Sequence, residues 1–213
     1  MMKTIGKRKN ILYNECQRKR KDKAMAERNK GIRLSSRYIK DYTVFDLETT
    51  GINIQRDAII EISAVKVRDH EIIDEFTTLV NPGRPIPAGA TAVNGITDAM
   101  VADAPCLVEA IGDFLTFIGD DVLVGHNIHT FDTNFAYDAA FHGLGVELRN
   151  DYIDTLFMAR KCLSRLHHHK LTDLAAYFGF TTEGAHRALV DCRMNQACYE
   201  AMGKLMEPAK EKR

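Results

Sequence analysis

Several features that mark common classes of protein are missing from this sequence. No window approaches the roughly 18 consecutive apolar residues that a membrane-spanning helix requires. The N-terminus is basic but lacks the apolar stretch of a secretory signal. The five cysteines are odd in number and include no C-x-x-C pair, which disfavours a disulfide framework or a zinc site. We therefore expect reduced thiols in a cytoplasmic protein without membrane contact.

Net charge is also absent overall, but two parts of the chain differ strongly in charge. Residues 1–40 contain fourteen Lys and Arg and three acids, a net charge of +11, so the remainder carries −11. This split predicts a basic N-terminal arm (1–40), helical or partly disordered, an acidic domain (41–206) and a charged C-terminal tail (207–213). The basic arm could contact nucleic-acid phosphates, or it could be a solubilising tail or a helix lying against the domain.

The domain has the pattern of an α/β protein. Three strands rich in Ile and Val are expected first, followed by a Pro/Gly loop at 81–90; the strands are at 42–48, 58–68 and 71–80. Helices and short strands then alternate. The expected helices are at 104–118, 131–142, 155–160, 171–178 and 188–206, and the strands at 121–125 and 152–154. This order predicts a mixed sheet flanked by helices.

Two carboxylates stand at the end of the first predicted strand. Asp46 and Glu48 are two residues apart, so both side chains should project from one face of the strand. Two buried carboxylates side by side repel each other unless a cation neutralises them. Their oxygens are the ligands that hard divalent ions such as Mg²⁺ favour. The alternative is a pair of solvent-facing acids on an edge strand, which the apolar flanks disfavour.

A second group follows another predicted strand. The sequence Gly125-His126-Asn127 ends this strand, and Asp132 comes in the first turn of the next helix. The carboxyl ends of parallel strands are where α/β folds place their sites. An acid in a first helical turn is also a common favourable charge without any further role, so Asp132 alone would indicate little.

The third group is the pair His186 and Asp191. Five residues apart on a helix, the two side chains would point to different faces, so we expect His186 in the loop or first turn before the helix that holds Asp191. A histidine on such a mobile junction could swing over a water and take its proton, because the ordinary imidazole pKa is about 6.5. A surface histidine at a turn is the frequent alternative.

Together these groups resemble the motifs of a known family. The strings VFDLETTG (44–51), GHN…FD (125–132) and HRALVD (186–191) resemble the three exonuclease motifs of the DEDDh, or DnaQ-like, 3′→5′ exonucleases, above all those of the PolC-type DNA polymerase III exonuclease domain. The connecting segments NGIT (94–97) and YIDT (152–155) are also similar. The resemblance covers roughly residues 42–202. It implies a ribonuclease H-like fold, a five-stranded mixed sheet with one antiparallel strand and helices on both faces.

The resemblance also assigns roles to individual residues. It implies four metal-binding acids, a histidine general base and two Mg²⁺ or Mn²⁺ ions about 4 Å apart, which would let an acidic domain hold a phosphodiester. The acids are Asp46, Glu48, Asp132 and Asp191, and the base is His186. Asp46, Glu48 and Asp191 would hold one ion, with Asp46 and Asp132 at the second. The residues expected at the terminal nucleotide are Leu47, Thr49, Thr50, Gly51 and Asn127.

The function implied is a stand-alone exonuclease that releases nucleoside 5′-monophosphates from a 3′ end, with a polymerase or repair protein as a possible partner. DNA is the expected substrate, but RNA stays an alternative because such a site need not contact a 2′-hydroxyl. A non-catalytic module that binds nucleic acid through the same fold is the third hypothesis. The intact acids and histidine argue against it.

Other polar residues near these motifs are interpreted as structural. Asp154 should cap the helix that follows it. The adjacent histidines 167–169 cannot all reach one ion and are assigned to a solvated loop. Asp57 and Glu61 are interpreted as surface or strand-edge acids.

Overall fold

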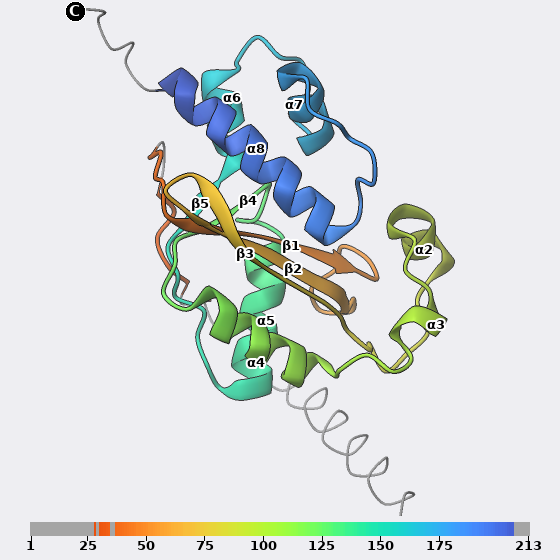
Figure 1. Cartoon of the computed structure of the whole chain (residues 1–213). Coiled ribbons are helices and arrows are strands. Elements are labelled where there is room, and N and C mark those ends of the chain that lie inside the picture. The colour runs from red at the N-terminus through yellow and green to blue at the C-terminus, as the bar shows by residue number, and fades with distance from the viewer. Residues whose placement is uncertain (1–27, 29, 35–36, 207–213) are drawn as a thin grey trace, which may run out of the picture.

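The computed structural model describes residues 28, 30–34 and 37–206 and arranges them as a sheet with helices on both faces (Figure 1). The strands are β1 (Tyr42–Thr49), β2 (Ile59–Arg68), β3 (Glu71–Leu79), β4 (Leu123–Gly125) and β5 (Tyr152–Asp154). The helices are α2 (Ala88–Asn94), α3 (Asp98–Val101), α4 (Leu107–Ile118), α5 (Asp132–Leu144), α6 (Thr155–Cys162), α7 (Leu171–Phe178) and α8 (Ala188–Met206). Within the described ranges, no helix combines the length and apolar character needed to cross a membrane.

The sheet has the order β3-β2-β1-β4-β5. Strand β2 runs antiparallel to both of its neighbours, whereas β1, β4 and β5 are parallel. This arrangement confirms the predicted mixed five-stranded sheet with one antiparallel strand. It also brings the ends of β1 and β4, which carry two of the three motifs, to the same edge of the sheet.

Both faces of β1 are buried, and this makes it the central strand. Phe45 and Leu47 belong to the core under α4 and α5, while Tyr42 and Val44 belong to the core under α6, α7 and α8. Figure 1 shows these two helical layers on opposite faces, with α2 and α3 beyond the end of the sheet where β1 ends. The alternation of side chains along a strand therefore places Asp46 and Glu48 on the face covered by α8.

The predicted loop at 81–90 is wrong in its last part. Helix α2 begins at Ala88, inside that range, and the short α3 follows. The sequence of α2 contains Gly, Thr and Val, which are weak helix formers, and it has no amphipathic period. Local hydrogen bonds close its C-terminal end instead, because Thr91 Oγ1 donates to the Ile96 carbonyl and Gly95 N donates to Thr91 O, and Asn94 at this end is buried.

The described end of the basic arm packs on the domain and is not helical. Arg28 donates two hydrogen bonds of 2.8 Å to the carboxylate of Asp138 in α5. Tyr152 N donates to Ile32 O, and Leu34 N donates to Tyr152 O, so this segment lies parallel beside β5. Residues 1–27, like the tail 207–213, lie outside the described residues. The boundary at 41 and the role of the basic arm stay predictions.

Candidate active site

Three carboxylates from distant parts of the chain converge at the end of β1. Asp46 and Glu48 extend from β1, and Asp191 extends from the first turn of α8. Each offers an oxygen, and these oxygens lie within 4.8 Å of one another. Among the described residues, this cluster joins two of the three sequence motifs in one place.

Asp132 joins this cluster through the main chain of β1. It lies in the first turn of α5, is only 3% exposed, and its Oδ1 accepts a hydrogen bond of 3.2 Å from Leu47 N, between Asp46 and Glu48. Its oxygens are not part of the mutual 4.8 Å group, but its charge raises the pKa of Asp46. The structure thus brings all four expected acids together.

Burial and mutual repulsion oppose full ionisation of the four carboxylates in the absence of a cation. Burial raises the pKa of Asp46 well above its usual range, and the charges of Asp132, Asp191 and Glu48 raise it further. Burial, followed by the charge of Asp191, raises the pKa of Glu48 to about 8, against a hydrogen bond from Asn94. Burial raises the pKa of Asp132 to about 7 and also raises that of Asp191.

This donor set fits hard divalent ions. It consists of carboxylate oxygens only, and its uncompensated negative charge is the condition that Mg²⁺ or Mn²⁺ relieves. A cation among these oxygens would lower the pKa values that burial and repulsion raise. The number and identity of the ions stay predictions.

His186 lies immediately before α8, in the position expected from helical spacing. Its backbone has a φ of +70°, and its N–H donates to Asp191 Oδ2 over 3.1 Å. The residue is exposed. The junction was expected to be mobile, but the main chain of His186 is fastened to an acid of the cluster. Any swing of the imidazole therefore belongs to its side-chain torsions.

The expected substrate-contacting residues lie at the end of β1, in the loop that follows it and in the loop between β4 and α5. Thr49 Oγ1 donates to Gly51 O, and Thr50 Oγ1 accepts from Ala58 N, so the loop after β1 is closed by its own hydrogen bonds. A Cβ on Gly51 would lie 2.5 Å from the Asp57 carboxylate, so a side chain at this position would have to displace that carboxylate. The side chain of Leu47 is buried, which leaves only its main chain for such a role.

Asn127 lies in the other loop, between β4 and α5, with a φ of +64°. Its N–H and that of His129 donate to the carboxylate of Asp154. The same carboxylate accepts from the N–H groups of Leu156 and Phe157, which confirms Asp154 as the cap of α6. Asp154 thus ties the loop that precedes Asp132 to the start of α6.

The interpretation of Glu61 as a surface or strand-edge acid is wrong. Glu61 is only 3% exposed and lies in β2 directly opposite Glu48. It forms an ion pair with Arg187, the residue after His186. Sequence reasoning missed both residues because the strand register that brings them together is not visible in the chain. Asn94, which donates to Glu48, could have been found from its place in the NGIT segment.

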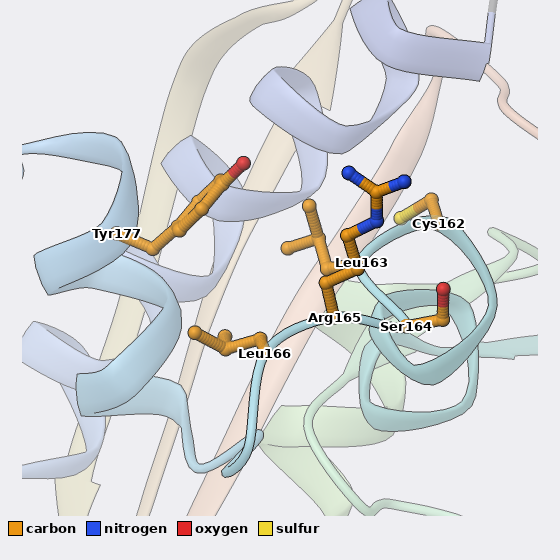
Figure 2. Close-up of a pocket in the computed structure, with 6 residues that line it drawn as sticks. All are labelled: Cys162, Leu163, Ser164, Arg165, Leu166 and Tyr177. Carbon is orange, nitrogen blue, oxygen red and sulfur yellow. The ribbon is translucent and has the colours of Figure 1, made fainter.

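Two other groups of polar residues lie outside the cluster. Asp57 is partly buried in the loop before β2, where it accepts from Asn53 N. The histidines 167–169 occupy a loop between α6 and α7, in line with their assignment to a loop. Beside that loop a pocket of about 260 Å³ opens between the end of α6 and α7, lined by residues 162–166 and Tyr177 (Figure 2). None of its lining residues is an expected site residue.

Comparison with known proteins identifies the family to which a chain with this fold and this acid cluster belongs. The family model described as Exonuclease (RNase_T) matches residues 43–199. The chain therefore belongs to the exonuclease family, whose members are hydrolases of nucleic-acid ends.

Two curated relatives and one solved structure describe the likeness further. The chain is 42% identical over 172 residues to DNA polymerase III PolC-type of Bacillus subtilis, a match that covers 80% of this chain but 12% of that protein. It is 37% identical to the DNA polymerase III subunit epsilon of Aquifex aeolicus, covering 72% of this chain and 75% of the relative. A structure of Exonuclease X in complex with 5′ overhanging duplex DNA superposes with a TM-score of 0.58 at 28% identity, covering 77% of this chain and 98% of that one.

Proposed function

We propose that this chain is a metal-dependent 3′→5′ exonuclease that removes nucleotides one at a time from DNA and releases nucleoside 5′-monophosphates. The observation that carries this proposal is the convergence of Asp46, Glu48 and Asp191, with carboxylate oxygens within 4.8 Å of one another. Asp132, bound to the main chain between the first two, completes the set. Membership of the exonuclease family supports the reaction class, and the resemblance of the three motifs to 3′→5′ exonucleases supports the polarity.

Four carboxylates would hold two Mg²⁺ or Mn²⁺ ions, with Asp46 between the two positions. When bound, such ions activate a water and stabilise the charge that develops on the leaving 3′ oxygen. The acids contribute a site that is already crowded with negative charge. Mutual repulsion among the acids favours a cation, and because burial and repulsion raise their pKa values, its binding is accompanied by release of protons.

His186 would accept the proton of the attacking water. The exposed imidazole stands on a main chain that is hydrogen-bonded to Asp191, so a side chain able to accept a proton lies next to the acids. We expect His186→Gln to lower kcat by about 10²- to 10⁴-fold with little change in KM, the usual contribution of a general base. Steady-state rates on a labelled oligonucleotide check this. His168→Gln, in the exposed loop after α6, serves as the control and should keep the normal rate.

DNA is the proposed substrate because one relative is named a PolC-type DNA polymerase III and the other a subunit of DNA polymerase III, and because the structure of Exonuclease X holds duplex DNA with a 5′ overhang. Such a duplex has a recessed 3′ end. The end of β1 and the adjoining loops would contact the terminal nucleotide, through Thr49, Thr50, Gly51, Asn127 and the main chain at Leu47. We further propose a cytoplasmic protein that works beside a polymerase or a repair protein.

The polarity is tested with DNA and RNA oligonucleotides labelled at one end, single-stranded or with a recessed 3′ end. In Mg²⁺, we expect DNA labelled at its 5′ end to shorten one nucleotide at a time, and DNA labelled at its 3′ end to lose the label at once as a mononucleotide. Cleavage from the 5′ end or inside the strand would contradict the proposal. Binding of DNA without cleavage would indicate a non-catalytic module, and faster cleavage of RNA would change the substrate.

A further inference from the structure

Glu61 occupies an unusual position for a carboxylate. It lies on β2 directly opposite Glu48 of β1, and residues that face each other across an antiparallel pair project to the same side of the sheet. Its charge raises the pKa values of Asp46, Glu48 and Asp191. A fifth buried carboxylate would therefore destabilise the cluster unless it were neutralised by a partner of its own.

The partner of Glu61 is the start of α8. Arg187 donates to Glu61 through Nε (3.2 Å) and Nη2 (2.8 Å), and Ala188 N donates to the same carboxylate over 3.1 Å. The two-pronged ion pair and the N-terminus of the helix both favour a negative charge at this place. Because both oxygens of Glu61 already accept hydrogen bonds, Glu61 is bound to the protein and is not left free as an ion ligand.

This contact fixes the residue next to it. His186 has the left-handed φ of +70°, which is unfavourable for any residue with a side chain and persists only when its surroundings hold it. On one side His186 N donates to Asp191, and on the other side Arg187 is fastened to Glu61. Since β2 is paired with β1, the backbone that carries the imidazole is attached to the strand that carries Asp46 and Glu48.

We propose that Glu61 and Arg187 are positioning residues for His186. Their ion pair ties the junction before α8 to β2 and so sets the place from which the imidazole reaches the reacting water. This inference rests on the proposed function, because it assigns an indirect role in the same reaction. Neither residue is proposed to touch the substrate.

The test compares the variants Glu61→Gln and Arg187→Gln at saturating Mg²⁺. We expect each to lower kcat by about 10- to 100-fold with KM nearly unchanged, because a displacement of about 1 Å at a reacting group has an effect of this size. The two variants change the charge next to the acids in opposite directions, so a similar loss in both cannot come from a changed electrostatic potential. The variant Arg187→Gln changes a side chain that is 45% exposed, so it should still fold. It keeps the test valid if Glu61→Gln fails to fold.

A matched control lies within α8, six residues after Arg187. Arg193 of α8 forms an equivalent two-pronged ion pair with Glu75 of β3. Glu75→Gln and Arg193→Gln should keep kcat within about twofold of the original protein, since exposed ion pairs contribute little. If they lower kcat as much as the variants of the first pair, the effect belongs to attachment of α8 in general and the proposal is overturned.

Combination with His186→Gln decides whether the pair acts through the histidine. We expect Glu61→Gln or Arg187→Gln to change kcat less than about twofold in the His186→Gln background, because residues that act as a unit show non-additive losses. Losses that multiply would overturn the proposal. Normal rates in both single variants, with a slow His186→Gln, would overturn the positioning role alone. A normal rate in His186→Gln would overturn both this role and the proposed base.

Discussion

Asp46→Asn is expected to lower the rate of 3′-end cleavage by at least about a thousandfold, equivalent to roughly 4 kcal/mol of lost transition-state stabilisation. Asp46 stands among the other three acids, and their charges all raise its pKa. It is also the acid proposed to contact both ions. Asparagine keeps the shape of the side chain but removes the charge that holds a cation. Single-turnover rates at saturating Mg²⁺ measure the loss.

The same substitution should leave the domain folded. In the presence of a chelator we expect Asp46→Asn to unfold at a higher temperature than the original protein, because it removes a carboxyl group whose ionisation is opposed by burial and by the charges of its neighbours. Thermal unfolding followed by circular dichroism measures this. Asp113→Asn, on the exposed face of α4, is the control and should change neither rate nor stability. A normal cleavage rate in Asp46→Asn would remove Asp46 from the site.

Removal of divalent ions is expected to abolish cleavage and to change how stability depends on pH. In the folded protein the pKa of Glu48 is raised to about 8 and that of Asp132 to about 7, above the values of about 4 in an unfolded chain. Between these values the folded state binds more protons than the unfolded state. Without ions, the contribution of these two groups to the free energy of unfolding should therefore be greatest below about pH 4. It should fall as the pH rises from about 4 to about 8.

Bound ions should reverse this fall, because they stabilise the ionised carboxylates. At pH 8, Mg²⁺ at about a hundred times its dissociation constant should raise the midpoint of thermal unfolding by roughly 5–10 °C. At pH 5, where protons compete with the ion, the rise should be much smaller. NaCl at equal ionic strength is the control for screening. Cleavage that persists in chelator, or an equal rise at both pH values, would argue against a metal site at these acids.

The sequence predicts the elements that carry the cluster because their signals are local. The first three strands are rich in Ile and Val, and the observed bounds of these strands and of α7 and α8 agree with the predicted ones to within a residue or two. Helical spacing alone separates His186 from Asp191, and α8 indeed begins between them. The family resemblance supplies the rest of the expected set, whose individual roles stay proposals.

The contacts that hold the site in place could not be predicted in the same way. Glu61 and Arg187 are 126 residues apart, and only the observed register shows that Glu61 faces Glu48. The described end of the basic arm makes a contact of similar sequence separation, since Arg28 forms an ion pair with Asp138, 110 residues further along the chain. Such partners depend on how strands and helices are brought together, which a single sequence does not reveal.

The segment around Arg33 has one more consequence, for association between molecules. As the last strand of the sheet, β5 would otherwise present unpaired backbone groups, which are a template for pairing with another chain. The N–H and the carbonyl of Tyr152 are instead paired by hydrogen bonds with the main chain of Ile32 and Leu34. A shortened protein that begins at Arg28 keeps this cover, whereas one that begins at Arg37 exposes an open edge that invites aggregation.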